Sequence, residues 1–281
     1  YIPLVYSLLI FLIVILKKFG MSQKILIIVI FLLTLFELFR FSYKFTPFVN
    51  TSLIYPKTKI TDFLLSQPKP FRVAATDRRI ANPNSLAAYG IESISGYDPL
   101  YLKSYATFVN SWQNNKAENS AAFNRFVTPE KLLNPISDLL NVNYILTFDE
   151  IKNENYKLVL EEGLTKLYFN TKALPRAFFP QQVLKVNSDI ELLNKITDPL
   201  ANFKNISYSL ESENINTNVI AKNQILKYSD QNISIKTSSN KNIPIIISNI
   251  YYPGWNAYID KKQTSVKKIN YIFQTIDIPE G

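Results

Sequence analysis

The side chains that could perform chemistry in this sequence are carboxylates and guanidinium groups, because histidine and cysteine are both absent. The absence of histidine removes the commonest general base and the commonest transition-metal ligand, and it excludes every catalytic triad that contains histidine. The absence of cysteine excludes disulfides and thiolate nucleophiles. The residues by themselves therefore predict no metal site and no catalytic centre of these common kinds.

Asp98 is the carboxylate in the most suggestive setting, within the segment Gly96-Tyr97-Asp98-Pro99. An aspartate there could act as a base, or it could hold a metal ion beside a sugar phosphate. It could equally accept hydrogen bonds from the amides of a tight turn, with Tyr97 packed beneath it. The turn role is the favoured one, so Asp98 is only a weak catalytic candidate.

Arginine side chains are the candidate phosphate ligands, because the planar guanidinium group matches the geometry of a phosphate. Arg72 and Arg78 lie upstream of the Asp98 segment, and Arg79 follows directly. Together with Tyr97 and Asp98, Arg72 and Arg78 form the candidate substrate-binding set. The alternative is that these arginines are dispersed over the surface without a common ligand.

The segment 249–260 contains the densest group of aromatic residues, with Tyr251, Tyr252 and Trp255 around a Pro253-Gly254 break. From Trp255 onward, apolar and polar residues alternate as far as Asp260, which is typical of a strand with one buried face. A turn over 260–263 and a partner strand over 264–269 are expected. We predict that Trp255 anchors the core, and sugar stacking by these aromatic side chains is the alternative.

The formal net charge of +9 admits nucleic acid, anionic lipid or acidic glycan as partners. The lysines are scattered among asparagine and serine, however, and no arginine-rich helix or zinc-finger spacing occurs. Nucleic acid is therefore not an expected partner.

Two apolar segments near the start predict a transmembrane helical hairpin over residues 1–43. The first segment covers residues 2–16, and the second runs from residue 25 to residue 36 and continues less purely to residue 43. The segment 17–24 between them carries three lysines and no acid, which predicts a cytoplasmic loop and places residues 44–281 outside the membrane. Glu37 lies in the second segment and is a weak functional candidate, but Arg40 follows three residues later, and both are expected to reach the membrane interface.

The rest of the chain predicts an α+β protein in two parts after a linker over 44–59. Residues 60–150 combine helical patterns over 60–67, 101–112 and 129–140 with strand patterns over 71–75 and 143–148, so a small mixed α/β unit is expected there. Thr61 is a candidate helix cap, and Thr128 with Pro129 a candidate helix start. Short alternating runs recur after residue 155, and they predict an antiparallel β-sandwich or jelly roll over 151–281.

Several segments, in one order, resemble a known family. The segment "YYPGWNAYID" is similar to the Y-Y-P-G-W-x-A-x-V-D-G-K signature of YfhO-like bacterial membrane proteins. "PNSLAAYGIESISGYDPLYLKSYATFV", "LLNVNYILT" and "LPRAFF" resemble three further segments of that family, and the helix that ends near Glu37 before "KFTPF" fits as well. The resemblance covers nearly the whole chain from about residue 25 onward.

The resemblance implies the C-terminal part of a polytopic membrane protein similar to GT-C glycosyltransferases. Such proteins take a sugar from a polyprenyl-phosphate donor, in some cases with a divalent metal, and transfer it to an envelope glycopolymer outside the bacterial cytoplasmic membrane. The catalytic carboxylate of that class lies in an early outer loop, so we expect a chain truncated at both ends, packed against upstream membrane helices, with no catalytic residue or cofactor of its own. Whether the chain belongs to an enzyme stays open. The alternative is a non-catalytic, membrane-tethered glycan-binding or scaffold module.

One position departs from the family pattern. Lys261 stands where the family signature has glycine, next to Asp260 in the expected turn. A two-residue hairpin turn of type I′ needs positive φ angles, which lysine adopts poorly. A longer turn is therefore expected here.

Overall fold

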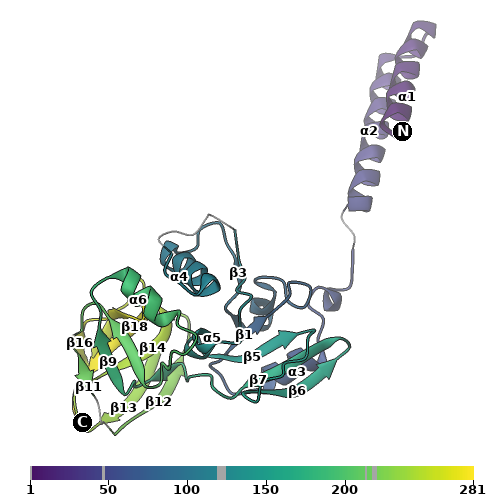
Figure 1. Cartoon of the computed structure of the whole chain (residues 1–281). Helices are drawn as coiled ribbons and strands as arrows, with labels where there is room; N and C mark the ends of the chain where they lie inside the picture. Colours follow the sequence, from purple (N-terminus) through teal and green to yellow (C-terminus); the bar gives the residue numbers. More distant parts are fainter. Residues whose placement is uncertain (1, 46–47, 119–124, 213, 217–219) are drawn as a thin grey trace. The chain divides into compact units, whose positions relative to one another are not determined.

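The computed structural model describes residues 2–45, 48–118, 125–212, 214–216 and 220–281 (Figure 1). The chain divides into two compact units, Tyr1–Pro56 and Lys57–Gly281. Over the described residues the protein is α+β, with an apolar N-terminal helix and several mixed and antiparallel sheets.

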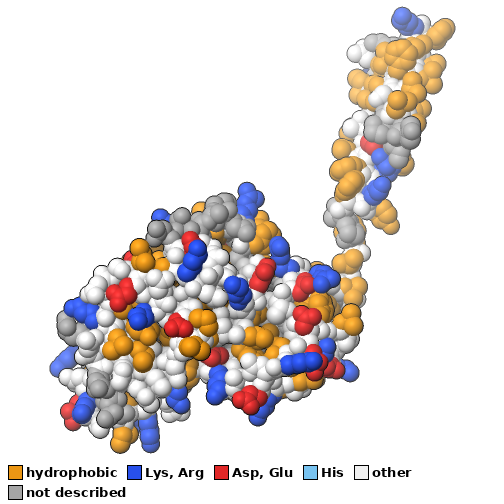
Figure 2. Space-filling model, in the orientation of Figure 1, with side chains coloured by type: hydrophobic (Ala, Val, Ile, Leu, Met, Phe, Trp, Pro, Cys, Tyr) orange, Lys and Arg blue, Asp and Glu red, His pale blue; other side chains and the backbone are white. Residues whose placement is uncertain are grey.

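The first unit is helical. It contains α1 (Ile2–Leu16), η1 (Lys17–Phe19), α2 (Gln23–Phe45) and η2 (Thr51–Leu53). Helix α2 has 23 residues and is the one helix in the described part of the chain that is long and apolar enough to cross a membrane, whereas α1 is apolar but shorter. Most large apolar side chains of both helices are exposed, and Figure 2 shows them covering the surface of this unit.

The first sheet of the second unit has the strand order β2-β1-β5-β7-β6. Its strands are β1 (Arg72–Ala75), β2 (Glu92–Ser93), β5 (Val142–Thr147), β6 (Tyr156–Glu162) and β7 (Thr165–Asn170). Strand β1 runs parallel to β2 and β5, and β7 runs antiparallel to β5 and β6. The sheet therefore extends across the domain boundary that was predicted at residue 150.

Three helices of the second unit bury apolar faces. Helix α3 (Lys59–Ser66) confirms the helix predicted over 60–67. The predicted cap Thr61 was wrong, because Thr58 is the N-cap and Thr61 is the third helical residue, which returns the bond in a capping box. Helix α4 (Lys103–Asn114) confirms the helix predicted over 101–112, and α6 (Asp189–Ile196) lies further along the chain. Trp112 on α4 is completely buried in the largest apolar cluster of the described residues.

Helix α5 (Pro135–Leu139) corrects the helix that was predicted over 129–140 from Thr128. Its N-cap is Asn134, whose side chain accepts from the amides of Ile136 and Ser137, and Pro135 is the first helical residue. Two prolines in the segment fit the same start pattern, and only Pro135 is preceded by a residue whose side chain caps the helix.

The C-terminal strands form short sheets. The sheet β17-β18-β14-β8 is built from β17 (Lys267–Ile269), β18 (Phe273–Ile278), β14 (Ile243–Ile250) and β8 (Ala177–Phe178). The sheet β10-β9-β11 contains β10 (Ile206–Ser209), β9 (Gln182–Lys185) and β11 (Ile215–Asn216). Paired strands are β12 (Ala221–Tyr228) with β13 (Ile233–Ser239), β15 (Ala257–Ile259) with β16 (Lys262–Thr264), and β3 (Gly96–Tyr97) with β4 (Phe126–Val127); η3 (Ser85–Tyr89) is a short 3-10 helix.

The hairpin of β15 and β16 corrects the turn and the partner strand that were predicted from sequence. Ile259 pairs with Lys262, so the turn contains only Asp260 and Lys261, with φ angles of 48° and 71°. These positive φ angles are the ones that a type I′ turn requires. Residues 267–269, which were expected to pair with the Trp255 strand, pair with β18 instead.

The strained lysine gives the first prediction. Replacing Lys261 by glycine (Lys261→Gly) should stabilise the second unit by about 0.5–1 kcal/mol, because glycine adopts positive φ without a steric penalty. Urea unfolding of the full chain in detergent measures the change. Lys262→Gly is the matched control: it removes a side chain from a regular strand position and should destabilise, and a loss of stability in Lys261→Gly as well would contradict the turn geometry.

Candidate functional site

A buried, charged cluster joins the first sheet to the C-terminal strands. Arg176, just before β8, has no exposed side-chain surface. Its Nη1 donates to Oε2 of Glu92 at 2.8 Å, to Oδ1 of Asn249 at 3.3 Å and to the hydroxyl of Tyr228. Its Nε donates to Oδ1 of Asn141 at 3.1 Å. One guanidinium group therefore connects four separate segments of the chain.

Arg72 is the second guanidinium group of this cluster, which we call the Arg72–Glu92–Arg176 cluster. Its Nη1 donates to the carbonyl of Leu140 at 2.8 Å and to Oγ of Ser248 at 3.1 Å, and its Nε lies 3.4 Å from Oε2 of Glu92. Burial, and then the nearby charge of Arg176, lower the pKa of Arg72 to about 10. Arg72 therefore lies on strand β1 and donates to groups of the protein itself. The sequence-based prediction was of an arginine available to a phosphate ligand.

The cluster carries more positive than negative charge. Two guanidinium groups share the single carboxylate of Glu92. The Nη2 of Arg176 has no hydrogen-bond partner among the described residues. Because buried charges are normally paired, the surplus positive charge favours an anionic group nearby.

A cleft of about 680 Å³ opens beside this cluster. Its walls include Arg72, Glu92 and Tyr228, and Asp98 also lies along it. Lys69, Tyr105 and Asp230 are among the other charged or aromatic residues along the cleft. Burial raises the pKa of Tyr105 to about 12, so this hydroxyl, which donates to the carbonyl of Ile94 at 2.8 Å, stays protonated at neutral pH. The cleft is therefore lined by two cations and by tyrosine hydroxyls, together with the three acids Glu92, Asp98 and Asp230.

The structure brings together only part of the predicted substrate-binding set. Arg72 and Asp98 both lie along the cleft. Arg78 lies along a smaller cavity of about 220 Å³ and places its guanidinium 5.2 Å from the ring centre of Phe126. Tyr97 is exposed and packs against the same Phe126 ring at 4.7 Å, so the prediction that it packs beneath Asp98 was wrong.

The turn role of Asp98 is confirmed. Its Oδ1 accepts from the amide of Leu100 at 2.7 Å, which is the side-chain-to-backbone bond of an Asx turn. Asn84 supports the preceding residue, because its side chain bonds both the amide and the carbonyl of Tyr97. A catalytic role for Asp98 stays a prediction. Glu37, the other weak candidate, forms an ion pair with Arg40 at 2.5 Å within α2.

Sequence reasoning missed the residues that define the cluster: Glu92, Asn141, Arg176, Tyr228 and Asn249. A signal was present for Arg176, since a lone arginine within the apolar run Leu174 to Phe179 must be buried with partners or interrupt a strand. No sequence pattern indicated Glu92 as its partner, because the two residues are 84 positions apart.

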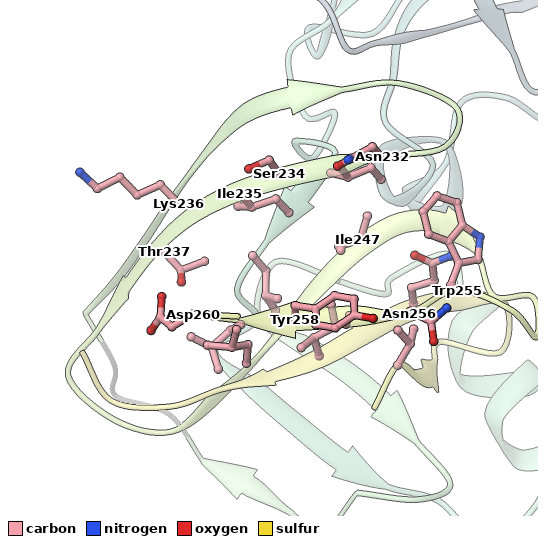
Figure 3. Close-up of a pocket in the computed structure, with 18 of the residues that line it drawn as sticks. Asn232, Ser234, Ile235, Lys236, Thr237, Ile247, Trp255, Asn256, Tyr258 and Asp260 are labelled. Carbon is pink, nitrogen blue, oxygen red and sulfur yellow. The ribbon is translucent and has the colours of Figure 1, made fainter. Parts of the chain in front are cut away.

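A second hollow, which we call the groove, has a volume of about 1040 Å³ and lies beside β13 and β15 (Figure 3). Trp255 is half-buried in its wall and belongs to none of the buried apolar clusters, contrary to the predicted core anchor. Tyr252 and Tyr258 also lie along the groove and are 56% and 64% exposed. Asp260 lies at one end of the labelled residues, beside Thr237 (Figure 3).

Comparisons of the sequence with models of protein families, of the sequence with curated proteins and of the fold with solved structures found no match. The family resemblance therefore stays a prediction. Within the described residues, no group of three or more acidic side chains is placed to hold a metal ion. The divalent metal and the polyprenyl-phosphate donor implied by the resemblance likewise stay predictions.

The Arg72–Glu92–Arg176 cluster gives the second prediction. Replacing Glu92 by glutamine (Glu92→Gln) should destabilise the second unit by about 2–3 kcal/mol, because it leaves two buried guanidinium groups without a countercharge. Urea unfolding of the full chain in detergent measures the loss.

Asp77→Asn is the matched control for this measurement. Asp77 forms a 2.6 Å ion pair with Arg79, whose side chain is exposed, so its neutralisation should cost less than about 1 kcal/mol. Equal effects of the two substitutions would contradict a structural role for the buried cluster.

Proposed function

We propose that this chain is the C-terminal part of a YfhO-like, multi-pass membrane protein that transfers sugar from a polyprenyl-phosphate donor to an envelope glycopolymer. The observation that carries the proposal is the surplus positive charge of the Arg72–Glu92–Arg176 cluster, which borders the cleft through Arg72. The cluster lies in a unit that follows the membrane-length helix α2 along the chain. The family segments quoted above support it, because they include Arg72's neighbour strands, the Asp98 turn and Arg176.

The cleft would hold a phosphate-bearing part of the donor or of the acceptor polymer. Arg72 supplies a guanidinium group at its wall, and the hydroxyls of Tyr105 and Tyr228 supply neutral polar groups. Guanidinium groups bind phosphate oxygens through paired hydrogen bonds, which suits this role. The catalytic carboxylate would come from an early outer loop of the same protein, and upstream membrane helices would pack against this chain.

The proposal includes the membrane arrangement. Helices α1 and α2 would form a hairpin in the bacterial cytoplasmic membrane, with membrane lipid around their apolar side chains. The lysines of residues 17–24 would lie in the cytoplasm, and residues 44–281 would lie outside. The C-terminal sheets would pack as a β-sandwich or jelly roll over residues 151–281.

One observation favours the alternative, a non-catalytic glycan-binding module. Tyr252 and Tyr258 are exposed along the groove. Trp255, which lies between them in the sequence, is half-buried in the groove wall. Aromatic side chains of this kind offer apolar faces on which sugar rings can stack. In this alternative the protein would hold a glycan at the groove without modifying it.

The absence of cysteine allows a clean test of the topology. Single-cysteine variants Ser22→Cys, between the two helices, and Ser238→Cys, on β13, are treated in intact cells with a membrane-impermeant maleimide. We expect labelling of Ser238→Cys at once and of Ser22→Cys only after the membrane is opened. Labelling of Ser22→Cys alone in intact cells would contradict the proposed orientation.

Sugar transfer is tested in cells that produce the intact membrane protein. Deleting residues 57–281 should abolish the sugar substituent on the envelope polymer, measured by NMR of the purified polymer. The variant Asp98→Asn is the control: its amide oxygen can still accept the Leu100 bond, so transfer should be retained. Unchanged polymer in the deletion strain would contradict the enzymatic proposal, and loss in Asp98→Asn would assign the carboxylate a catalytic role.

A further inference from the structure

The groove runs along strand edges rather than over a sheet face. Residues 230–237 all lie along it, and so do residues 252–260. Successive side chains of a strand point to opposite faces of the sheet. An unbroken run of residues along one hollow therefore means that the hollow faces the edge of the strand, where the backbone is accessible.

Both of these edges lack a neighbouring strand over most of their length. Among the described residues, β13 pairs only with β12, and β15 pairs only with β16. An unpaired edge presents a row of amide and carbonyl groups that can pair with another chain. The groove thus lies between two such rows.

The hydrogen-bond pattern identifies which backbone groups of β13 face the groove. Ser229 and Asn232 exchange backbone bonds of 2.9 and 3.4 Å and close the hairpin between β12 and β13. Because pairing alternates along an antiparallel ladder, the amides and carbonyls of Ile233, Ile235 and Thr237 point away from β12. Ser239 continues this series, and it exchanges backbone bonds of 2.8 and 2.9 Å with Gly281. This pair shows that the edge accepts an antiparallel neighbour.

The floor of the groove is apolar. Ile245 and Ile247 on β14 and Ile276 and Ile278 on β18 lie along it. On β13 the side chain of Ile235 is half-buried toward the same apolar cluster, while its neighbours on the strand are exposed. A strand placed in the groove would direct every second side chain onto these isoleucines.

We infer that the groove binds an extended polypeptide segment, which adds as a strand between β13 and β15. In Figure 3, Thr237 and Asp260 lie at one end of the groove, whereas Asn232, Trp255 and Asn256 lie at the other. The two edges therefore run in the same direction, and one added strand is antiparallel to both. The segment would carry apolar residues at alternate positions facing the isoleucine floor, with backbone bonds to both edges.

The charges along the groove favour a basic segment. Asp230, Asp260 and Glu280 are the acids that lie along it, and Lys236 is the one lysine or arginine among its described lining residues. A segment with lysines at its ends would complement this balance. The inference concerns a site separate from the cleft, so it does not depend on the proposed sugar transfer.

The test uses a fluorescent octapeptide in which valine alternates with threonine between terminal lysines. Its binding to the full chain in detergent is followed by fluorescence anisotropy. A matched peptide replaces alternate amides by esters, which removes backbone donors and keeps every side chain. We expect the ester peptide to bind about tenfold more weakly or worse, since several hydrogen bonds are lost.

Protein variants locate the site. Ile235→Asn places a polar group on the floor side and should weaken peptide binding about tenfold. Gln224→Asn is the control and should leave binding unchanged, because Gln224 is exposed on β12 and is not among the residues along the groove. The ester comparison needs no variant, so it stands even if Ile235→Asn unfolds the protein.

Three results would overturn the inference. The first is no peptide binding up to about 1 mM, the weak end of measurable affinity. The second is equal binding of the amide and ester peptides. The third is occupation of the groove by something else. One such case is a neutral oligosaccharide whose binding is lost in Ile235→Asn. The other is a second copy of the chain, seen by light scattering as a dimer that Ile235→Asn separates, while the peptide fails to bind.

Discussion

Arg176 is completely buried, and its guanidinium group reaches β2 through Glu92, the start of β5 through Asn141, β12 through Tyr228 and β14 through Asn249. A buried charge is costly unless it is paired and hydrogen-bonded, so this side chain restricts how those segments can pack. Figure 1 shows the first sheet and the C-terminal strands side by side within the second unit, with α5 between them. This one guanidinium group therefore ties four segments of that unit together.

Arg72 follows from the same constraint. It shares Glu92 with Arg176, and its other donors reach Leu140 and Ser248, so the two arginines compete for one carboxylate. The resulting surplus of positive charge belongs to the buried cluster, which reaches the wall of the cleft through Arg72. A group that stabilises the fold thus also sets the electrostatic character of the site, and an anion bound in the cleft would reduce the repulsion between the two guanidinium groups.

The groove has a different physical origin. Strands β12 and β13 form one ribbon and β15 and β16 another, and each ribbon leaves an edge without a partner in the described part of the chain. Proteins usually shorten, cover or charge such edges, because open edges attract other strands. Here the exposed faces carry Lys236, Tyr258 and Asp260, while the backbone groups of Ile233 and Ile235 remain accessible above an apolar floor. The open backbone edges and the apolar floor therefore suit the groove to an extended polypeptide. The aromatic side chains of Tyr252, Trp255 and Tyr258 are only one part of its lining.

Local patterns in the sequence were enough to predict the apolar helix α2, helices α3 and α4, and strands such as β1 and β5. Hydrophobic periodicity and helix-starting residues act within a few positions, so no distant contact is needed to recognise them. The sequence also indicated the turn at Asp98 from local turn chemistry. Folding in three dimensions was needed to reveal that Arg176 meets Glu92, that residues 267–269 pair with β18, and that Trp255 lies in a groove wall. Those outcomes depend on contacts between segments that are far apart in the sequence. Local propensity does not distinguish one possible partner from another, and the partner is selected by which arrangement pairs the buried charges and the backbone groups.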